Sequence, residues 1–145
     1  GIEAPLEEVV PASIGVKADI VSRDFTETGD RALLNLGHTI GHGVEFATAI
    51  SHVEAVAVGL VAAAAVSEHK LGFGETDVVL EALDRTGLPT ASPPADRSEV
   101  IRLIGLDKKR KADRLHITLL AGVGRPVIVE VDDDDIARGL AAIGL

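Results

Sequence analysis

The feature that most constrains the fold is the apolar run Glu54–Lys70, which has no polar face. Alanine and valine recur on nearly every side of it at helical spacing, and Gly72 follows as a helix stop. A helix that is apolar all round lies in the interior of a protein or in a membrane. The apolar stretch is shorter than the ~20 residues that span a bilayer. The run therefore predicts a central helix covered by other elements.

Composition limits what the rest of the chain does. Its 145 residues predict one domain, 1–145, with a core of aliphatic side chains. The net charge of −9 and the three aromatic residues argue against nucleic-acid binding. The absence of cysteine excludes disulfides and thiolate zinc sites and is compatible with the cytoplasm. No signal peptide opens the chain, and the start on Gly1 predicts a piece of a longer protein. We expect a cytoplasmic protein that binds no membrane.

The spacing of apolar residues, glycines and prolines predicts a mainly α fold, a multi-helix domain with one small β-hairpin. The expected elements are a short helix or arm over Gly1–Ile14 limited by Pro5 and Pro11, a glycine-containing helix over Arg31–Ile50, a break over Ser51–Glu54, a helix over Thr76–Thr86 capped by Thr76, a helix from Asp96 to about Leu106, a basic loop over Asp107–Arg114, a hairpin of Leu115–Leu120 and Val127–Val131, and a last helix over Ile136–Ile143.

One face of the second predicted helix carries several polar side chains. They recur at steps of 4, 3, 4 and 3 residues and are Arg31, Asn35, His38, His42 and Glu45. Such a face is costly to bury unless partners or a metal satisfy it. Histidines at i and i+4 can offer two nitrogens to one Zn²⁺, although such pairs are more often solvated or core histidines. His52, beyond a turn, is either an additional ligand or the reason that only one of the first two binds.

Glycines and charged runs add to this pattern. Gly41 and Gly43 allow a neighbour or ligand to approach closely and clear space around the imidazoles. The basic run Lys108–Lys111 is a solvated loop for most of its members, with one lysine available to clamp a phosphate or carboxylate. Lys17 and Glu27 are likewise either solvated side chains or members of a binding site. The acidic run Asp132–Asp135 starts the last helix and has no ligand role.

The order and spacing of these residues resemble the 3-dehydroquinate synthase family. The most specific part is Asn-x-Gly-His-Thr-x-Gly-His over 35–42, followed by His52-x-Glu54. Glu27-x-Gly29-x-Arg31, Gly87-Leu88-Pro89 and Asp107-Lys108-Lys109 follow the same family pattern. The resemblance covers nearly the whole chain but only the C-terminal half of that enzyme, so it implies the C-terminal domain of the dehydroquinate synthase-like fold.

The resemblance implies a lyase of the shikimate pathway, the route to the aromatic amino acids. The family converts 3-deoxy-D-arabino-heptulosonate 7-phosphate to 3-dehydroquinate and phosphate, with NAD⁺ as a regenerated oxidant and a divalent metal, usually Zn²⁺ or another such as Co²⁺. NAD⁺ belongs to an N-terminal domain that this chain does not contain. We therefore expect an inactive isolated piece, and a homodimer when the protein is full length.

The resemblance also implies roles for single residues. It assigns His38 and His52 to the metal, with a third ligand from the N-terminal half. The substrate-binding positions are Lys17, Arg31, Asn35 and one of Lys108 and Lys109, and the catalytic positions are His42, Glu27 and Asn35. Two positions depart from the family. Val53 stands where glycine is usual, and Asp30, where an apolar residue is commoner, predicts pairing with a nearby cation.

Other functions fit parts of the same pattern. A related sugar-phosphate cyclase would share the metal chemistry and act on sedoheptulose 7-phosphate or glucose 6-phosphate. An iron-type polyol dehydrogenase also presents spaced histidines, but a simple alcohol needs no clamp of the Arg31 and Asn35 kind. A non-catalytic helical interaction module is the fourth alternative. Arg31 with Asn35 and the Lys108-Lys109 pair favour a carboxylated substrate.

Overall fold

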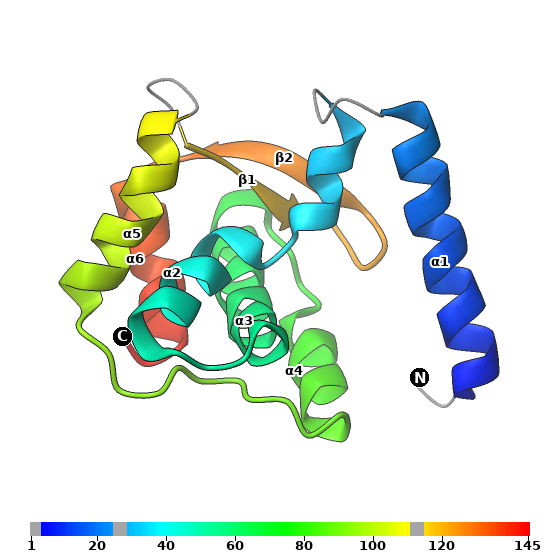
Figure 1. Ribbon diagram of the computed structural model, residues 1–145, viewed down its shortest axis with the longest axis horizontal. Helices are drawn as coiled ribbons and strands as arrows, with labels where there is room; N and C mark the ends of the chain where they lie inside the picture. The colour runs from blue at the N-terminus through cyan, green and yellow to red at the C-terminus, as the bar shows by residue number, and fades with distance from the viewer. Residues whose placement is uncertain (1–3, 25–28, 111–114) are drawn as a thin grey trace. The chain divides into compact units, whose positions relative to one another are not determined.

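The computed structural model describes residues 4–24, 29–110 and 115–145, with the backbone alone over 106–110. The chain comprises two compact units, Gly1–Leu34 and Asn35–Leu145. Helices and one two-stranded hairpin make up the regular structure of the described residues, which confirms the mainly α fold class (Figure 1). The expectation of one domain over 1–145 stays a prediction.

The first unit contains helix α1, Leu6–Arg23. The prediction that Pro5 limits this helix is confirmed, whereas the prediction that Pro11 limits it was wrong. Pro5 is the N-cap, and Pro11 lies inside the helix, where its missing N–H removes one hydrogen bond without ending the element. Beyond the helix, the carboxylate of Asp24 accepts hydrogen bonds from the backbone N–H groups of Gly29 (2.7 Å) and Arg31 (3.1 Å). Asp30 pairs with Arg23 at 3.7 Å, as its unusual position predicted.

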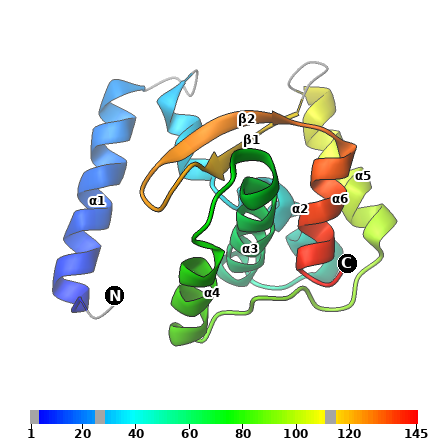
Figure 2. The same cartoon turned by 180° about the vertical axis from the view of Figure 1, so that it is seen from behind.

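In the second unit, helix α3, His52–Leu71, is the central element. It packs against α2 (His38–Thr48), α4 (Thr76–Arg85), α6 (Asp133–Ala142) and strand β1 (Leu115–Leu120) (Figures 1 and 2). Its buried residues lie on all sides of the helix: Ala55, Ala57, Val58, Gly59, Val61, Ala62, Ala63, Ala64, Val66 and Ser67. The central apolar helix predicted from the sequence is therefore confirmed.

The stretch predicted as one helix over Arg31–Ile50 is divided, so that prediction was wrong. A 3₁₀ helix, η1, covers Asp30–Asn35, and α2 begins only at His38. Gly37 separates them with a left-handed φ of 77°, a conformation that favours glycine. A Cβ on Gly37 would also lie 2.9 Å from the backbone nitrogen of Leu60 on α3. Arg31 and Asn35 therefore share no helix face with the histidines of α2.

The predicted break over Ser51–Glu54 is instead the start of α3. Ser51 is the N-cap: its hydroxyl accepts from the Glu54 N–H, and the Glu54 carboxylate accepts from the Ser51 N–H at 3.0 Å, which completes a capping box. Hydrogen bonds from the Ser51 hydroxyl and backbone hold the pKa of Glu54 below its ordinary value. Val53 lies in this first helical turn. Val53 has a negative φ, because Ala49 is the non-glycine residue with positive φ among the described residues. Valine therefore fits at position 53 without backbone strain, although glycine is usual there.

The later elements follow the predicted order. Helix α5 runs over Arg97–Arg110, so the first part of the predicted basic loop is helical and 111–114 lie outside the described residues. Strands β1 (Leu115–Leu120) and β2 (Pro126–Val131) form the predicted antiparallel hairpin, with Leu115 opposite Val131. Thr76 does not cap α4, because its hydroxyl donates to Glu68 instead. No helix in the described ranges has both the length and the apolar character needed to cross a bilayer.

The acidic run Asp132–Asp135 forms the N-cap and first turn of α6, so it is a helix start, as predicted. Asp132 is the N-cap and forms a capping box with Asp135. The Asp135 side chain is 6% exposed and accepts a hydrogen bond from the Lys70 ammonium of α3 at 2.5 Å. Burial raises the pKa of Asp135, but the hydrogen bonds from Lys70 and the Asp132 backbone outweigh it, so the pKa lies below its ordinary value of 3.8. This ion pair connects α3 to α6.

We expect the Asp135→Asn variant to lose about 2 kcal/mol of unfolding free energy near neutral pH, because it leaves Lys70 without its buried partner. A lowered folded pKa stabilises the fold above the unfolded value and is lost as the pH falls through the folded value. Urea unfolding between about pH 2 and pH 7 should therefore show a gap between parent and variant that closes on acidification. Asp134→Asn, an exposed change in the same turn, should show no such closing gap; a pH-independent difference for Asp135→Asn contradicts the prediction.

Candidate metal centre

Three imidazole rings converge where α2 meets the start of α3. The ring centroids of His38 and His42 lie 5.4 Å apart, and each lies 5.5 Å from the ring of His52. His38 and His42 are one helical turn apart on α2, and His52 is the first residue of α3. The structure therefore brings together the three histidines that the sequence singled out.

Two of these rings have a fixed orientation. Nδ1 of His38 lies 3.1 Å from the Leu36 carbonyl oxygen, and Nδ1 of His52 lies 3.1 Å from a carboxylate oxygen of Glu45. Both partners can only accept, so each Nδ1 carries a proton and each neutral ring has its lone pair on Nε2. Metal-binding histidines typically donate their other N–H to a carbonyl or carboxylate in this way. The donor set of His38 and His52 therefore fits a divalent metal.

A second grouping uses the same cluster. Among the described residues, one set of three potential ligands places its donor atoms within 4.8 Å of one another: His42, Glu45 and His52. This set includes His42 and Glu45 in place of His38. No hydrogen bond between described residues fixes the ring of His42, which distinguishes it from the other two. The sequence assignment of His38 and His52 to the metal stays a prediction.

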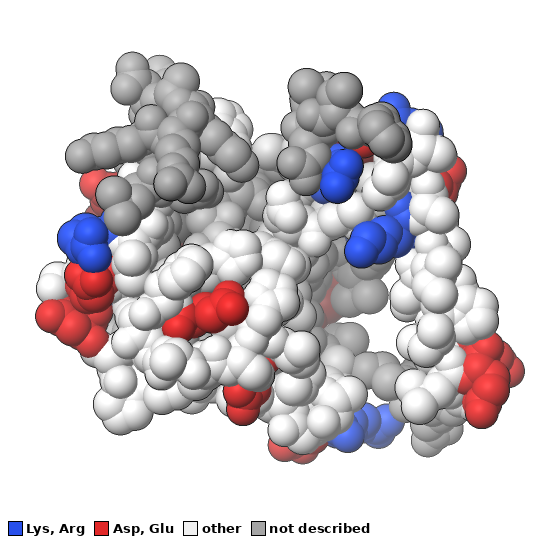
Figure 3. Space-filling model, viewed as in Figure 1, with Lys and Arg blue, Asp and Glu red and all other residues white. Residues whose placement is uncertain are grey.

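The cluster lies at the surface of the second unit. His42 and His52 are exposed, and His38 and Glu45 are half-buried. In the view of Figure 3, uncharged residues cover most of the face over α2, with isolated acidic groups between them. The imidazoles are thus accessible to an ion or ligand from outside the unit.

The glycines of α2 do not clear space around the imidazoles, so that expectation was wrong. A Cβ on Gly41 would lie 2.7 Å from the Ala55 carbonyl oxygen of α3, and a Cβ on Gly43 would lie 2.9 Å from Ile104 of α5. Both glycines face neighbouring helices and let them approach closely. Their effect on the histidines is indirect, because Gly41 sets the distance between α2 and α3 and Gly43 sets the distance between α2 and α5.

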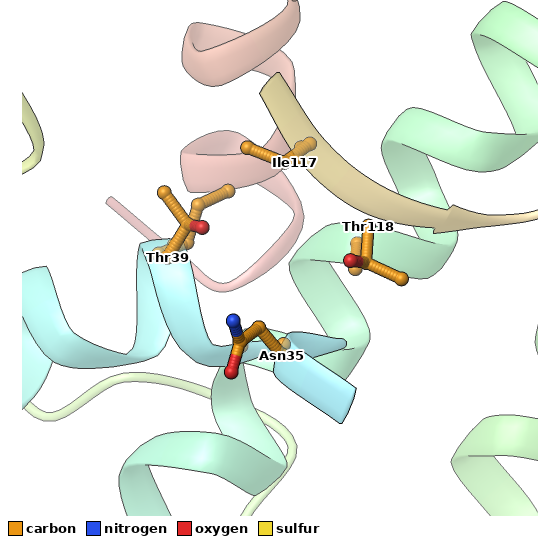
Figure 4. A pocket seen from close by; sticks show the side chains of 8 residues that line it. Asn35, Thr39, Ile117 and Thr118 are labelled. Carbon is orange, nitrogen blue, oxygen red and sulfur yellow. The ribbon is translucent and has the colours of Figure 1, made fainter. Parts of the chain in front are cut away.

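Asn35 lies at the end of η1, on the rim of a small cavity. Gly37, Thr39, Gly59 and Thr118 line the cavity with it, from η1, α2, α3 and β1 (Figure 4). Asn35 is exposed, and Thr118 is buried. The amide of Asn35 is therefore available to a hydroxylated ligand. Contrary to the sequence prediction, however, Asn35 does not lie on one helix face with His38 and His42.

The remaining predicted site residues lie elsewhere in the chain. Lys17 is exposed on α1, and Arg31 lies in η1; both belong to the first unit. Glu27 lies outside the described residues. Lys108 and Lys109 lie in α5, where the structure describes the backbone alone.

Two features of the site were missed in the sequence. The hydrogen bond from His52 to Glu45 joins residues on two helices, and spacing on one helix gives no signal for it. The capping box of Ser51 and Glu54 that fixes the start of α3 does have a signal, because Ser-x-x-Glu before an apolar run is the pattern of a helix N-terminus.

Solved structures define the class of this fold. The chain is similar to 2-deoxy-scyllo-inosose synthase in complex with carbaglucose-6-phosphate, NAD⁺ and Co²⁺, with a TM-score of 0.77 and 27% identity over 90% of this chain and 39% of that one. A second structure of 2-deoxy-scyllo-inosose synthase gives a TM-score of 0.73, with 28% identity over 85% of this chain and 36% of that one. The fold is that of the dehydroquinate synthase-like enzymes.

Sequence comparisons narrow the class to a family. The family model for the C-terminal domain of 3-dehydroquinate synthase matches residues 2–110, so the chain belongs to this family. It is 39% identical over 139 residues to 3-dehydroquinate synthase of Aeropyrum pernix, covering 93% of this chain. It is 41% identical over 143 residues to 3-dehydroquinate synthase of Acidithiobacillus ferrooxidans, covering 94% of this chain. The chain spans 39% of the length of each relative.

Proposed function

We propose that this chain is the metal- and substrate-binding part of a 3-dehydroquinate synthase. The reaction is the conversion of 3-deoxy-D-arabino-heptulosonate 7-phosphate to 3-dehydroquinate and phosphate, a carbon–oxygen lyase step of the shikimate pathway. The observation that carries the proposal is the cluster of His38, His42 and His52, two of whose rings direct Nε2 away from their hydrogen-bond partners. Membership of the family supports the same function.

The proposal gives each residue a task. A bound divalent metal, Zn²⁺ or Co²⁺, supplies polarisation of a substrate hydroxyl, and bound NAD⁺ supplies a reversible hydride acceptor. His38 and His52 hold the metal, and His42 moves a proton. Asn35 hydrogen-bonds the substrate. Guanidinium and ammonium groups suit carboxylate and phosphate. Binding of the anionic groups of the sugar-acid phosphate is therefore assigned to Arg31, Lys17 and one of Lys108 and Lys109. Glu27 is the proposed active-site acid.

The rest of the enzyme is also part of the proposal. NAD⁺ binding and a third metal ligand are assigned to the N-terminal part of the enzyme, so the 145-residue chain alone should not turn over substrate. We expect a homodimer for the full-length protein and a cytoplasmic location. The polyol dehydrogenase and the non-catalytic module have less support, because the family match favours the synthase over both. The histidine cluster argues only against the non-catalytic module.

We expect Co²⁺ to bind the 145-residue chain and to raise its melting temperature. His38→Ala and His52→Ala should each weaken Co²⁺ binding by about 100-fold or more, since each removes one of two proposed protein ligands. His69→Ala, an exposed histidine near the other end of α3, is the matched control and should bind Co²⁺ like the parent. Equal Co²⁺ affinity in all four proteins, measured by titration calorimetry, contradicts the metal assignment.

Turnover tests the reaction itself. The chain joined to the amino-terminal part of the Aeropyrum pernix relative should release phosphate from 3-deoxy-D-arabino-heptulosonate 7-phosphate when NAD⁺ and Co²⁺ are present. A folded, Co²⁺-binding chimera that releases none would contradict the proposed reaction. The similarity to 2-deoxy-scyllo-inosose synthase favours a second candidate, a related sugar-phosphate cyclase. Turnover of glucose 6-phosphate or sedoheptulose 7-phosphate in preference to the sugar-acid phosphate would support that candidate.

A further inference from the structure

Glu45 itself has been given no task in the proposed function, although its carboxylate contacts His52. Oε2 of Glu45 lies 3.1 Å from Nδ1 of His52, and the two side chains are 26% and 53% exposed. Glu45 belongs to the last two turns of α2, and His52 is the first residue of α3. The hydrogen bond therefore crosses the short connection between the two helices that carry the histidine cluster.

The backbone on both sides of this contact is held by hydrogen bonds that do not involve the ring of His52. The N–H of Ala49 donates to the Glu45 carbonyl in a left-handed C-cap with φ 57°, which ends α2. The capping box of Ser51 and Glu54 holds the first turn of α3. An imidazole that is half exposed can still rotate about its side-chain bonds. Among the described residues, the carboxylate of Glu45 is the hydrogen-bond partner that fixes the ring.

We infer that Glu45 is a positioning residue for metal binding by His52, an inference that rests on the proposed function. Its carboxylate accepts a hydrogen bond from Nδ1, which keeps the lone pair on Nε2 of a ring whose centroid lies 5.5 Å from those of His38 and His42. A carboxylate in this position also makes the imidazole a stronger donor to a metal. Glu45 acts on the metal through His52.

Co²⁺ titration of the 145-residue chain tests this inference, because Co²⁺ reports its ligands in the visible spectrum. Glu45→Ala should raise the Kd for Co²⁺ about 10–100-fold, the effect typical of a lost partner of a ligating histidine. Glu45→Gln should cause a smaller increase, since its amide oxygen still accepts the hydrogen bond without the charge. At saturating Co²⁺ both variants should keep the band positions of the parent. Glu81→Ala, an exposed glutamate of α4 that pairs with Arg85, is the matched control.

Three results would overturn the inference. An unchanged Kd in Glu45→Ala would show that His52 needs no positioning. A changed saturated spectrum would make Glu45 itself a ligand, as its place within 4.8 Å of the donor atoms of His42 and His52 allows. A metal-free melting temperature lowered together with an unchanged Kd would make Glu45 a stability residue only. If His38→Ala and His52→Ala also leave Co²⁺ binding unchanged, the proposed function fails; if they abolish it and Glu45→Ala does not weaken it, only this inference fails.

Discussion

Replacing Gly59 with alanine is expected to lower the free energy of unfolding by about 3 kcal/mol and to weaken Co²⁺ binding. Gly59 lies in the middle of α3, where its Cβ would overlap the Gly37 carbonyl oxygen and lie 2.9 Å from the Gly41 nitrogen. All of these atoms belong to the backbone, so no side-chain rotation can relieve the overlap. Helix propensity alone would favour alanine over glycine by up to about 1 kcal/mol, so the sign of the change tests the packing.

The same substitution should act on the metal centre. Moving α2 away from α3 to make room for the new methyl group separates His38 and His42 from His52. Urea unfolding gives the stability, and the Co²⁺-induced rise in melting temperature gives the state of the cluster. Gly105→Ala is the control, because a Cβ there would meet no described atom outside its own helical turns within 4 Å, and it should keep or slightly raise stability. A Gly59→Ala variant as stable as Gly105→Ala would show that α2 and α3 do not pack this closely.

The central helix and the hairpin could be predicted because each depends on a local pattern. Residues 54–70 offer no polar face, so only the interior position of α3 satisfies them. The β-branched segments Leu115–Leu120 and Val127–Val131 are separated by a short glycine-containing turn, which predicts an antiparallel pair. Position 126 also belongs to β2, a difference of one residue at the strand boundary.

The division of the predicted helix over Arg31–Ile50 depends on contacts that are distant in sequence. Helical spacing continues across Gly37, and a single glycine in a helix costs only about 1 kcal/mol. Gly37 takes its left-handed conformation where its backbone meets Val56 and Leu60 of α3, an approach that any side chain would block. The sequence shows the glycine but not the helix that passes beside it, so periodicity alone assigned Arg31 and Asn35 to the wrong element.

The candidate site was predictable in part for a related reason. His38 and His42 share a face of α2 through their spacing alone, and the structure confirms that their rings are neighbours. His52 joins them because Ala49 turns the chain and Ser51 starts a new helix. The Ser-x-x-Glu pattern was available as a signal for that start, whereas the left-handed alanine had none.

The largest functional effect is expected for His42→Ala, which should separate proton transfer from metal binding. The rings of His38 and His52 are each fixed through Nδ1, as expected of metal ligands, and no described hydrogen bond fixes the ring of His42. His42 is exposed and 5.4–5.5 Å from both of the other rings, within reach of a ligand held there. We therefore expect His42→Ala to lower kcat of the chimeric synthase by about 10²–10⁴-fold, the contribution typical of a general acid or base.

Metal binding by the same variant decides between the two groupings of the cluster. If His38 and His52 hold the metal, His42→Ala should keep the Co²⁺ affinity of the parent within about threefold, because a residue outside the ligand set and its hydrogen-bonded partners changes affinity little. His52→Ala should lose both Co²⁺ binding and turnover, and His69→Ala should lose neither. Loss of Co²⁺ binding in His42→Ala would instead select the set of His42, Glu45 and His52, whose donor atoms lie within 4.8 Å of one another. The proton would then have to be moved by a group other than His42.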